Sequence, residues 1–412
     1  MLSYQEAVDF LFPRTTTIRF GLERTLELLD VVGAPHRVVP SIHVGGTNGK
    51  GSVTTLVAAA LAEAGWRVGV YTSPHLVSFR ERITVLGQPI SEAAVAMWTT
   101  RLKPDIERLG ATFFEASTAI AFADLAARGA EIAVIEVGLG GRLDSTNVVD
   151  PLVSGVTKIA MDHQKYLGET LEAIAAEKAG IAKPGAPFII GERDPRLVEV
   201  LRQAARTAVR NRSPAATADI RVVPPEYEWT GPLGLLGRHQ RRNAAVAQGI
   251  LMALPGSYRP GPEAVAAGFA SAFIPGRLDR RGRWVFDVAH NPDGVQALVA
   301  AIDDLALPRP INALVSILSD KDWPEMLVAL DRGVDRGILT VAPTASGRRW
   351  NSEWLTRWLH NRDRPPARAS WRLIEDFDLA LAEVQREAGT ILVTGSFHTV
   401  GDVMAAVGLT PF

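Results

Sequence analysis

Residues 41–76, SIHVGGTNGKGSVTTLVAAALAEAGWRVGVYTSPHL, decide the fold, because they predict a strand, a glycine-rich turn, a helix and a second strand in succession. The first strand covers residues 38–44, the helix 53–64 and the second strand 67–72. Such a unit directs several backbone N–H groups and the positive end of the helix to one point, which suits a phosphate group. It predicts a parallel sheet covered by helices.

The glycine-rich turn differs from the standard phosphate-binding pattern, G-x-x-x-x-G-K-[ST]. Lys50 follows Gly49, but the hydroxyl comes one residue late, at Ser52, and Val44 stands where the pattern has its first glycine. Lys50 still offers a positive charge to phosphates, and Ser52 or Thr54 offers a hydroxyl to a magnesium-bound phosphate. The alternative is a tight turn whose glycines serve only steric needs. The strand before the turn and the helix after it favour a phosphate loop.

The composition excludes several classes of protein. Among 412 residues, 44 are basic and 45 acidic, so the net charge of -1 argues against a global field for nucleic acid or membrane surfaces. The chain contains no cysteine, which excludes disulfides, thiolate metal sites and a thiol nucleophile. The first 21 residues do not resemble a signal peptide, and no apolar run has membrane-spanning length. These features predict a cytoplasmic protein.

The pattern of strands and helices predicts two domains. Strands are expected at 130–137 and 152–157, and a helix at 171–183. A second series is expected to have strands at 283–290, 311–318, 337–342 and 390–395, with helices at 293–304, 323–331, 351–361 and 376–387. We therefore predict an α/β protein with an N-terminal P-loop domain (1–275), a linker (276–282) and a smaller, Rossmann-like C-terminal domain (283–412). Both domains should contain a mostly parallel sheet flanked by helices.

The segment EVGLGGRLDSTNVVD (136–150) follows a predicted strand directly. Ligands of α/β proteins bind at the carboxyl ends of parallel strands, so Glu136 is a candidate magnesium ligand. The glycines at 138, 140 and 141 let the backbone approach a ligand closely. A glycine-rich turn in which Asp144 caps the next segment is an equally good interpretation of the spacing alone.

Three other groups of polar residues invite a functional or a structural interpretation. His163 follows a predicted strand and is either a metal ligand or a structural histidine; Lys178 lies on a predicted helix, where a surface ion pair is the alternative. In FDVAHNP (286–292), Asp287, His290 and Asn291 suit a nucleotide, or an N-cap before Pro292. Arginines in turn-rich segments indicate an anionic substrate, although some belong to the solvated surface. These arginines are Arg80, Arg82, Arg142, Arg238, Arg241, Arg242 and Arg277.

Together, these motifs resemble the folylpolyglutamate synthase and dihydrofolate synthase family, within the Mur ligase superfamily. The resemblance covers nearly the whole chain. It is carried by GLERTLELLD (21–30), HVGGTNGKGS (43–52), TSPHLVSFRERI (72–83), FFEASTAIAF (113–122), EVGLGGRLDSTNV (136–148), DHQKYLGETLEAIAAEKAGI (162–181), PGRLD (275–279), DVAHNP (287–292) and TGSFHTVGD (394–402). Val288 departs from the family, which usually has glycine there, and it adds a side chain beside Asp287.

The resemblance implies roles for individual residues. Those implied to bind ATP are Thr47, Asn48, Gly49, Lys50, Gly51, Ser52, Asn243, Arg277 and Asp287. Those implied to hold magnesium, as two ions, are Ser52, Ser73, Glu136 and His163. Those implied to line the pterin site are Thr112, Phe113, Phe114, Glu115, Arg142, Leu143, Asp144 and Ser145. The implied catalytic residues are Lys50, His290 and a carbamylated Lys178.

The implied reaction serves folate biosynthesis and one-carbon metabolism. ATP phosphorylates a carboxylate of dihydropteroate or a folate, and the amine of L-glutamate displaces the phosphate to form an amide. The alternatives are a synthase that acts on folates only, another Mur-type amino-acid ligase, or a regulatory P-loop ATPase. The expected partners are these small molecules alone, with no nucleic acid and no membrane, and the chain is expected to be a monomer.

Overall fold

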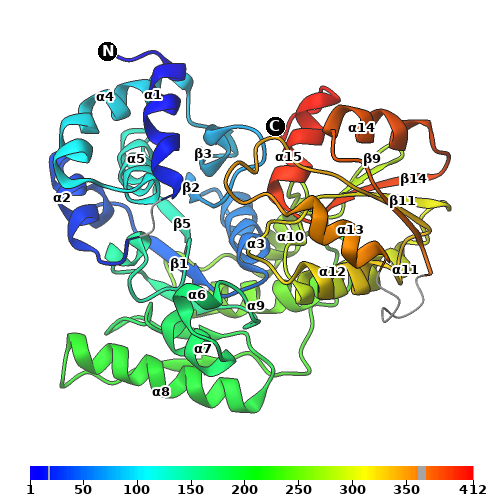
Figure 1. Cartoon of the computed structure of the whole chain (residues 1–412). Coiled ribbons are helices and arrows are strands. Elements are labelled where there is room, and N and C mark those ends of the chain that lie inside the picture. Colours follow the sequence, from blue (N-terminus) through cyan, green and yellow to red (C-terminus); the bar gives the residue numbers. More distant parts are fainter. Residues whose placement is uncertain (17–18, 361–367, 412) are drawn as a thin grey trace. The chain divides into compact units, whose positions relative to one another are not determined.

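The computed structural model describes residues 1–16, 19–360 and 368–411 and divides the chain into two compact units (Figure 1). The first unit combines Met1–Gly234 with Arg241–Ala272, and the second combines Leu235–Gln240 with Phe273–Phe412. Each unit is α/β, which confirms the predicted fold class. None of the helices in the described ranges is long and apolar enough to cross a membrane.

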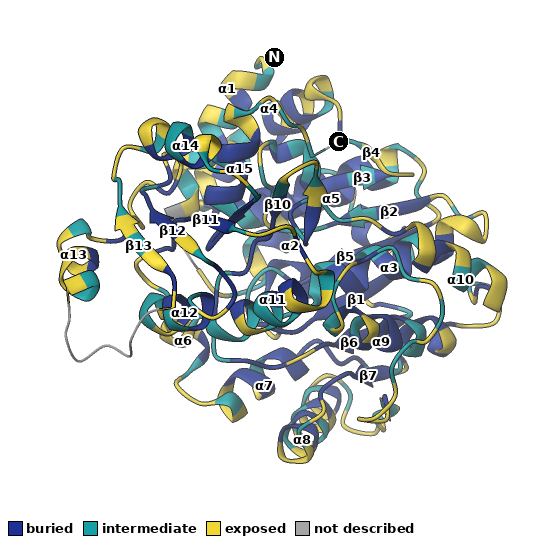
Figure 2. Ribbon diagram, turned by 90° about the vertical axis from the view of Figure 1, so that its right-hand side faces the viewer, coloured by how far each residue is buried: buried dark blue, intermediate teal, exposed yellow. Residues whose placement is uncertain are grey.

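The first unit contains an eight-stranded sheet in the order β4-β3-β2-β5-β1-β6-β7-β8. All neighbouring strands are parallel except β2–β3 and β3–β4. The strands are β1 Ser41–Gly45, β2 Val68–Tyr71, β3 Ile83–Val85, β4 Gln88–Pro89, β5 Ile132–Glu136, β6 Val153–Val156, β7 Phe188–Ile190 and β8 Ile220–Val222. Every residue of β1 and β5 is buried, as expected for central strands of a parallel sheet that is covered on both faces (Figure 2).

Helices cover the sheet of the first unit. They are α1 Tyr4–Leu11, α2 Glu23–Val31, α3 Lys50–Glu63, α4 Glu92–Leu109, α5 Phe113–Ala127, α6 Gln164–Leu167, α7 Leu171–Ala179, α8 Pro195–Arg212, α9 His239–Ala253 and α10 Pro262–Ser271, with 3₁₀ turns η1 Phe12–Thr16, η2 Pro35–Arg37, η3 Phe79–Arg82 and η4 Ser145–Val148. One apolar core joins α1, α2, α4 and α5, and another joins α7 and α8. Helix α10 packs so closely on α3 that a Cβ added to Gly268 would lie 2.5 Å from the nitrogen of Ala60.

The second unit contains a six-stranded sheet in the order β13-β12-β11-β14-β10-β9, in which only the β9–β10 pair is antiparallel. The strands are β9 Asp279–Arg281, β10 Trp284–Phe286, β11 Ile311–Val315, β12 Arg336–Leu339, β13 Ser370–Leu373 and β14 Thr390–Thr394. The helices are α11 Pro292–Leu305, α12 Trp323–Leu330, α13 Ser352–His360, α14 Phe377–Arg386 and α15 Phe397–Ala406. Its core lies mainly between the sheet, α11 and α12.

The segment predicted as a linker, residues 276–282, contains β9. Asp279–Arg281 pair with β10 through a tight turn at Gly282, whose φ is +63°. The division between the units falls between Ala272 and Phe273. The sequence did not predict that residues 235–240 belong to the second unit.

Candidate active site

The phosphate loop, residues 46–49, joins β1 to α3 and needs glycine at both ends. Gly46 has φ +135°, and a Cβ there would lie 1.9 Å from the hydroxyl oxygen of Thr157. Gly49 has φ +91°, and a Cβ there would lie 2.5 Å from Oδ1 of Asn243 in α9. Only glycine combines these backbone conformations with so little space. The loop also brings Asn243, a predicted nucleotide contact, to the start of α3.

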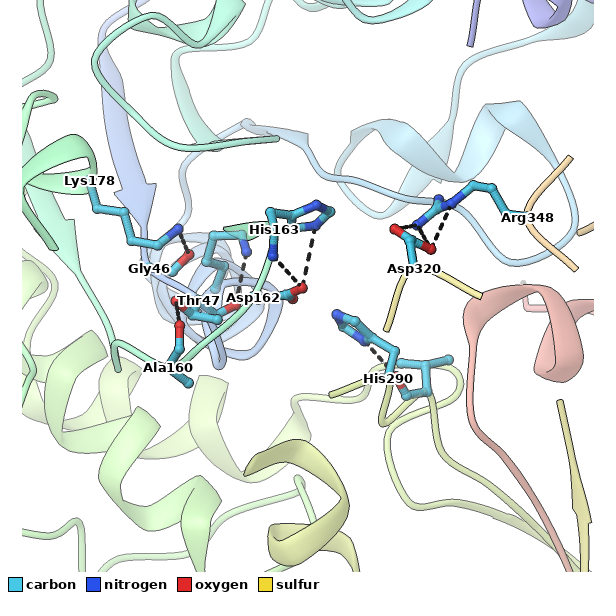
Figure 3. Close-up of polar contacts among 11 residues, drawn as sticks. Gly46, Thr47, Ala160, Asp162, His163, Lys178, His290, Asp320 and Arg348 are labelled. Carbon is cyan, nitrogen blue, oxygen red and sulfur yellow. Dashed lines mark hydrogen bonds and ion pairs between the residues drawn. The ribbon is translucent and has the colours of Figure 1, made fainter. Parts of the chain in front are cut away.

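Hydrogen bonds fasten the phosphate loop to the segment that follows β6. The backbone N–H of Thr47 donates to the carbonyl of Lys158 at 2.8 Å, and its hydroxyl donates to the carbonyl of Ala160 at 3.1 Å (Figure 3). The hydroxyl of Thr157 donates to the carbonyl of Asn48 at 2.7 Å. Bonds made within the protein therefore set the shape of the loop. The segment continues to His163, which links the loop to a predicted metal ligand.

Two lysine amines reach the backbone of the same loop. Nζ of Lys50 donates to the carbonyl of Thr47 at 3.1 Å, and Nζ of Lys178 donates to the carbonyl of Gly46 at 2.9 Å (Figure 3). The side chain of Lys178 is buried. Burial, and then the positive charge of Lys50, lower the pKa of Lys178 from 10.5 to about 7. A substantial fraction of this amine is therefore neutral near neutral pH.

The structure brings three of the four predicted magnesium ligands to the first turn of α3. Glu136 ends β5, and its carboxylate oxygens would lie 3.9 Å from a Cβ on Gly51. Its Oε2 also accepts a hydrogen bond from the N–H of Ser73 at 3.2 Å. Ser52 lies on the same helical turn as Gly51. Carboxylate and hydroxyl oxygens are the ligands that magnesium prefers, so these residues fit that ion.

The fourth predicted ligand, His163, has a left-handed backbone with φ +53°. The carboxylate of Asp162 accepts its N–H at 2.8 Å and lies 3.9 Å from its Nε2 (Figure 3). Asp162, which directly precedes His163, was not predicted from the sequence as a site residue. Within residues 1–16, 19–360 and 368–411, no three His, Asp or Glu side chains gather as a metal-binding group. The predicted magnesium ligands include only one carboxylate, that of Glu136, and one imidazole, that of His163. The other coordination positions would be filled by serine hydroxyls and by oxygens of the bound substrates.

The glycine loop, residues 138–145, lies between α5 and the end of α7. A Cβ on Gly138 would lie 2.2 Å from the ring of Phe114, and one on Gly141 would lie 2.9 Å from the carbonyl of Lys178. The N–H of Arg142 donates to the carbonyl of Glu177 at 3.0 Å, and its Nε donates to the carboxylate of Glu177, also at 3.0 Å. The predicted substrate loop and the helix that carries Lys178 therefore form one packed structure.

The predicted pterin contacts at the start of α5 differ in their surroundings. Thr112 and Glu115 form a capping box, and Glu115 is also ion-paired with Arg24 at 2.8 Å. Phe113 is buried in the core, where its ring contacts that of Phe79. Phe114 is partly exposed and covers Gly138. Phe114 is thus the member of this group best placed to offer a face to a ligand.

In the second unit, Asp287 organises the backbone that carries Arg277 and His290. Its carboxylate accepts the N–H groups of Leu278 and Ala289, each at 2.9 Å, and burial raises its pKa. The imidazole Nδ1 of His290 lies 2.9 Å from the carbonyl of Val288. The guanidinium of Arg277 lies over a phenylalanine ring of α15, 5.6 Å from its centre. The hydrogen bonds of Asp287 therefore hold the backbone next to Arg277 and the backbone next to His290.

Val288, the departure from the family pattern, fits its place. Its side chain is 1 % exposed, and its N–H donates to the carbonyl of Gly276 at 2.9 Å. Its backbone lies outside the left-handed region, so valine introduces no strain of the kind that would require glycine.

The sequence analysis also missed polar groups at the carboxyl edge of the second sheet. Asp320 follows β11 and forms a two-oxygen ion pair with Arg348, the shortest contact being 2.7 Å (Figure 3). The hydroxyl of Thr344 lies 2.9 Å from Nδ1 of His398, and its N–H donates to Asp402 at 3.1 Å. Their position after parallel strands was the one available signal, since the segment around 342–350 has no distinctive pattern.

Comparison with protein families identifies both units. Residues 44–251 match the Mur ligase middle domain, and residues 276–397 match the Mur ligase, glutamate ligase domain. The dihydrofolate synthase/folylpolyglutamate synthase of Bacillus subtilis is 32% identical, over 97% of this chain and 98% of its own length. A bifunctional folylpolyglutamate synthase/dihydropteroate synthase of Haloferax volcanii is also 32% identical, but this chain spans only 50% of its length.

Solved structures agree with these relatives. FolC of Escherichia coli, in complex with DHPP and ADP, superposes with a TM-score of 0.83 at 31% identity, covering 99% of this chain and 98% of that one. A bifunctional folylpolyglutamate synthase/dihydrofolate synthase with Mn, AMPPNP and L-glutamate bound superposes with a TM-score of 0.82 at 30% identity, covering 99% of both chains.

Proposed function

The chain belongs to the folylpolyglutamate synthase and dihydrofolate synthase family of Mur ligases, and we propose that it ligates L-glutamate to dihydropteroate and to folates at the expense of ATP. The products are dihydrofolate and folate polyglutamates, together with ADP and phosphate. The observation that carries the proposal is that Lys50 and Lys178 both bond to the phosphate loop, while the carboxylate of Glu136 lies beside the first turn of the helix that follows it.

The proposed reaction has two steps. A carboxylate oxygen of the acceptor attacks the γ-phosphorus of ATP, the bond to the β-phosphate oxygen breaks, and an acyl phosphate and ADP form. The amine of L-glutamate then attacks the acyl carbon, loses a proton, and expels phosphate as the amide forms. The first step moves negative charge across the γ-phosphoryl group, so fixed positive charge and N–H groups beside it lower the barrier.

The phosphate loop would supply that stabilisation. Thr47, Asn48, Gly49, Gly51 and Ser52 would bind the phosphates, mainly through backbone N–H groups, and Lys50 would place its charge beside them. The bonds from Thr47 to Lys158 and Ala160 set the loop before the nucleotide arrives. Asn243, Arg277 and Asp287 would contact the nucleotide, and His290 would lie near the transferred phosphate.

Ser52, Ser73, Glu136 and His163 would hold magnesium, as two ions. When bound, magnesium neutralises charge on the phosphates and polarises the transferred group. The carboxylate of Glu136 is already oriented by the N–H of Ser73 at 3.2 Å.

Lys178 would act as a carbamate. Its pKa of about 7 leaves neutral amine available to add carbon dioxide, which releases a proton and converts a cation into an anion. The carbamate nitrogen keeps one N–H, which can still donate to the carbonyl of Gly46. The new carboxylate would then extend from the loop toward the metal side of the site.

The glycine loop would hold the acceptor together with the start of α5. The proposed contacts are Thr112, Phe113, Phe114, Glu115, Arg142, Leu143, Asp144 and Ser145. Phe114 supports the proposal best, because its partly exposed ring covers Gly138 and can stack on a flat heterocycle.

The deciding experiment measures phosphate release with and without each substrate. A ligase releases phosphate only when ATP, L-glutamate and an acceptor are all present. Phosphate release that is equal without acceptor would instead favour a regulatory ATPase, and turnover with other amino acids or acceptors would favour another Mur-type ligase. Comparing dihydropteroate with tetrahydrofolate and its mono-glutamate separates the bifunctional enzyme from a synthase that acts on folates only.

The proposed enzyme is a monomer of the cytoplasm, as the sequence predicts. Light scattering should then give a mass near 44.4 kDa in solution.

A further inference from the structure

A chain of buried side chains runs behind the glycine loop. It starts at His43 in β1, three residues before the phosphate loop, continues through Thr146 in η4, and ends at Asp144. Nε2 of His43 lies 2.8 Å from the hydroxyl oxygen of Thr146, and that hydroxyl makes a short hydrogen bond to Oδ1 of Asp144. His43 and Thr146 have no exposed surface, and Asp144 is 5% exposed.

The hydrogen bonds of this chain have a direction. A carboxylate only accepts, so the hydroxyl of Thr146 donates to Asp144 and must accept from Nε2–H of His43. Burial and the charges of Lys183 and Arg212 lower the pKa of His43 to about 3, which keeps its imidazole neutral. Its buried Nδ1 has no hydrogen-bond partner in the part of the chain that the structure describes, in agreement with a proton on Nε2.

Asp144, at the end of this chain, closes the glycine loop on itself. Its Oδ2 accepts the N–H of Leu139 at 2.8 Å, and its Oδ1 accepts the N–H of Thr146 at 3.0 Å. The two donors lie on either side of the turn of the loop. The Asp144 carboxylate therefore joins the two sides of the loop, and the hydroxyl of Thr146 supplies a side-chain bond that holds the carboxylate in place.

The anchors of the phosphate loop are made by other residues. They are the bonds of Thr47 to residues 158 and 160, of Thr157 to Asn48 and of Lys178 to Gly46, and none of them involves His43 or Asp144. Loss of the Thr146 hydroxyl should thus disturb one binding loop and leave the other intact.

We propose that Thr146 and His43 are positioning residues that hold Asp144, and with it the glycine loop, in the shape that binds the acceptor. The inference rests on the proposed ligase function. It assigns to two side chains that touch no substrate a selective effect on acceptor binding.

The test compares Michaelis constants in Thr146→Val, which keeps the volume of the side chain and removes its hydroxyl. The KM for dihydropteroate should rise about tenfold or more, while the KM for ATP should stay within about twofold of the wild-type value. Thr146→Ser should restore acceptor binding, because serine keeps the hydroxyl. His43→Leu should reproduce the defect, and the double variant should be no worse than either single variant, since both break one chain.

Thr99→Val is the matched control. Thr99 is buried in α4, and its hydroxyl has no hydrogen-bond partner among the described residues. The same chemical change there should leave both Michaelis constants unchanged. An equal rise in both constants for Thr146→Val, or unchanged constants with reduced stability, would overturn the inference in favour of a merely structural hydroxyl.

A second measurement needs no turnover and covers a variant that is too unstable for kinetics. Amide hydrogen exchange in Thr146→Ser and Thr146→Ala, at low temperature, should show faster exchange at residues 138–147 in the alanine variant alone, with residues 46–52 unchanged. Uniform exchange in both variants would also contradict the inference. If wild-type enzyme shows no turnover that requires glutamate and acceptor, the proposed function fails instead, and the exchange result still reports on the loop.

Discussion

At the scale of single residues, Lys178 combines deep burial, a lowered pKa and a position beside the phosphate loop. We predict that Lys178→Ala lowers turnover by at least about a thousandfold, because it removes the proposed carbamate from the reacting centre. Acetate or propionate should restore part of the activity by placing a free carboxylate in the vacated space, whereas bicarbonate should not. Phosphate release under saturating substrates measures both effects.

Lys183 provides a control for that prediction. It is also buried, with a pKa lowered to about 8 by burial, but its Nζ donates to the carbonyl of Asn147 instead of the phosphate loop. Lys183→Met should lower the stability of the protein, and added acetate or propionate should not restore any activity that this variant loses. Turnover of Lys178→Ala near the wild-type level would contradict the carbamate role.

His43 makes the stability of the protein depend on pH in a predictable direction. Burial lowers the pKa of its imidazole to about 3 in the folded chain, from an ordinary value of 6.5. As the pH falls below 6.5, the unfolded chain gains a proton that the folded chain does not, so the free energy of unfolding decreases until about pH 3. Between pH 7.5 and 5.5, wild type should lose about 1.4 kcal/mol more than His43→Gln, which lacks this titration. Urea unfolding of both proteins at the two pH values checks the difference, and equal losses would contradict it.

At the scale of elements, the joint between β1 and α3 can be tested at one glycine. Gly49→Ala should raise the KM for ATP at least about tenfold, because a methyl group strains the left-handed backbone and displaces Asn243. Nucleotide binding measured by calorimetry reports the effect directly.

A substitution at Gly65 separates the effect of backbone strain from the effect of displacing Asn243. It follows the other end of α3 with φ +90°, almost the same as +91° at Gly49, but nothing lies within 4 Å of a Cβ built there. Gly65→Ala should lower stability by about 1–2 kcal/mol without changing ATP binding. If both variants bind ATP normally, the contact between Gly49 and Asn243 has no role in nucleotide binding.

Several strands that are buried on both faces could be predicted from the sequence, whereas the three-residue buried strand β7 and the edge strands of the second sheet could not. β5 and β11 were found because parallel strands between helices are near-continuous apolar runs. β9 and β13 were missed, since they lie at the edges of their sheet and include exposed or partly exposed arginines. Polar sequence at a sheet edge has no periodicity that distinguishes it from a loop.

The candidate site shows the same limit. Glu136 and His163 were predicted because each follows a parallel strand, and the topology of the sheet alone places such residues at one edge. The capping box of Thr112 and Glu115 follows a local T-x-x-E pattern, but the ion pair of Glu115 could not be predicted, since its partner Arg24 lies 91 positions away. Contacts of that kind follow from packing and leave no local pattern.

At the scale of the whole molecule, nucleotide and metal should stabilise the fold together. ADP at about a hundred times its Kd should add about 2.7 kcal/mol to the free energy of unfolding, and EDTA should remove part of that gain. Glu136→Gln should keep the part that does not depend on metal and lose the rest, because it removes the carboxylate charge beside Ser73. Thermal unfolding with ADP, with and without magnesium, measures each part, and an EDTA effect of equal size in Glu136→Gln would argue against a metal at this carboxylate.

The close packing of α10 on α3 has a consequence for the newborn chain on the ribosome. α3 ends at Glu63 and α10 begins at Pro262, so its covering partner is translated roughly 200 residues later. At typical translation rates, that delay is roughly ten to forty seconds. Throughout this time the apolar surface of α3 that α10 later covers stays exposed to solvent. We therefore expect chaperones to bind the nascent protein. Slow codons before residue 271 should therefore reduce the yield of folded enzyme more than slow codons after it.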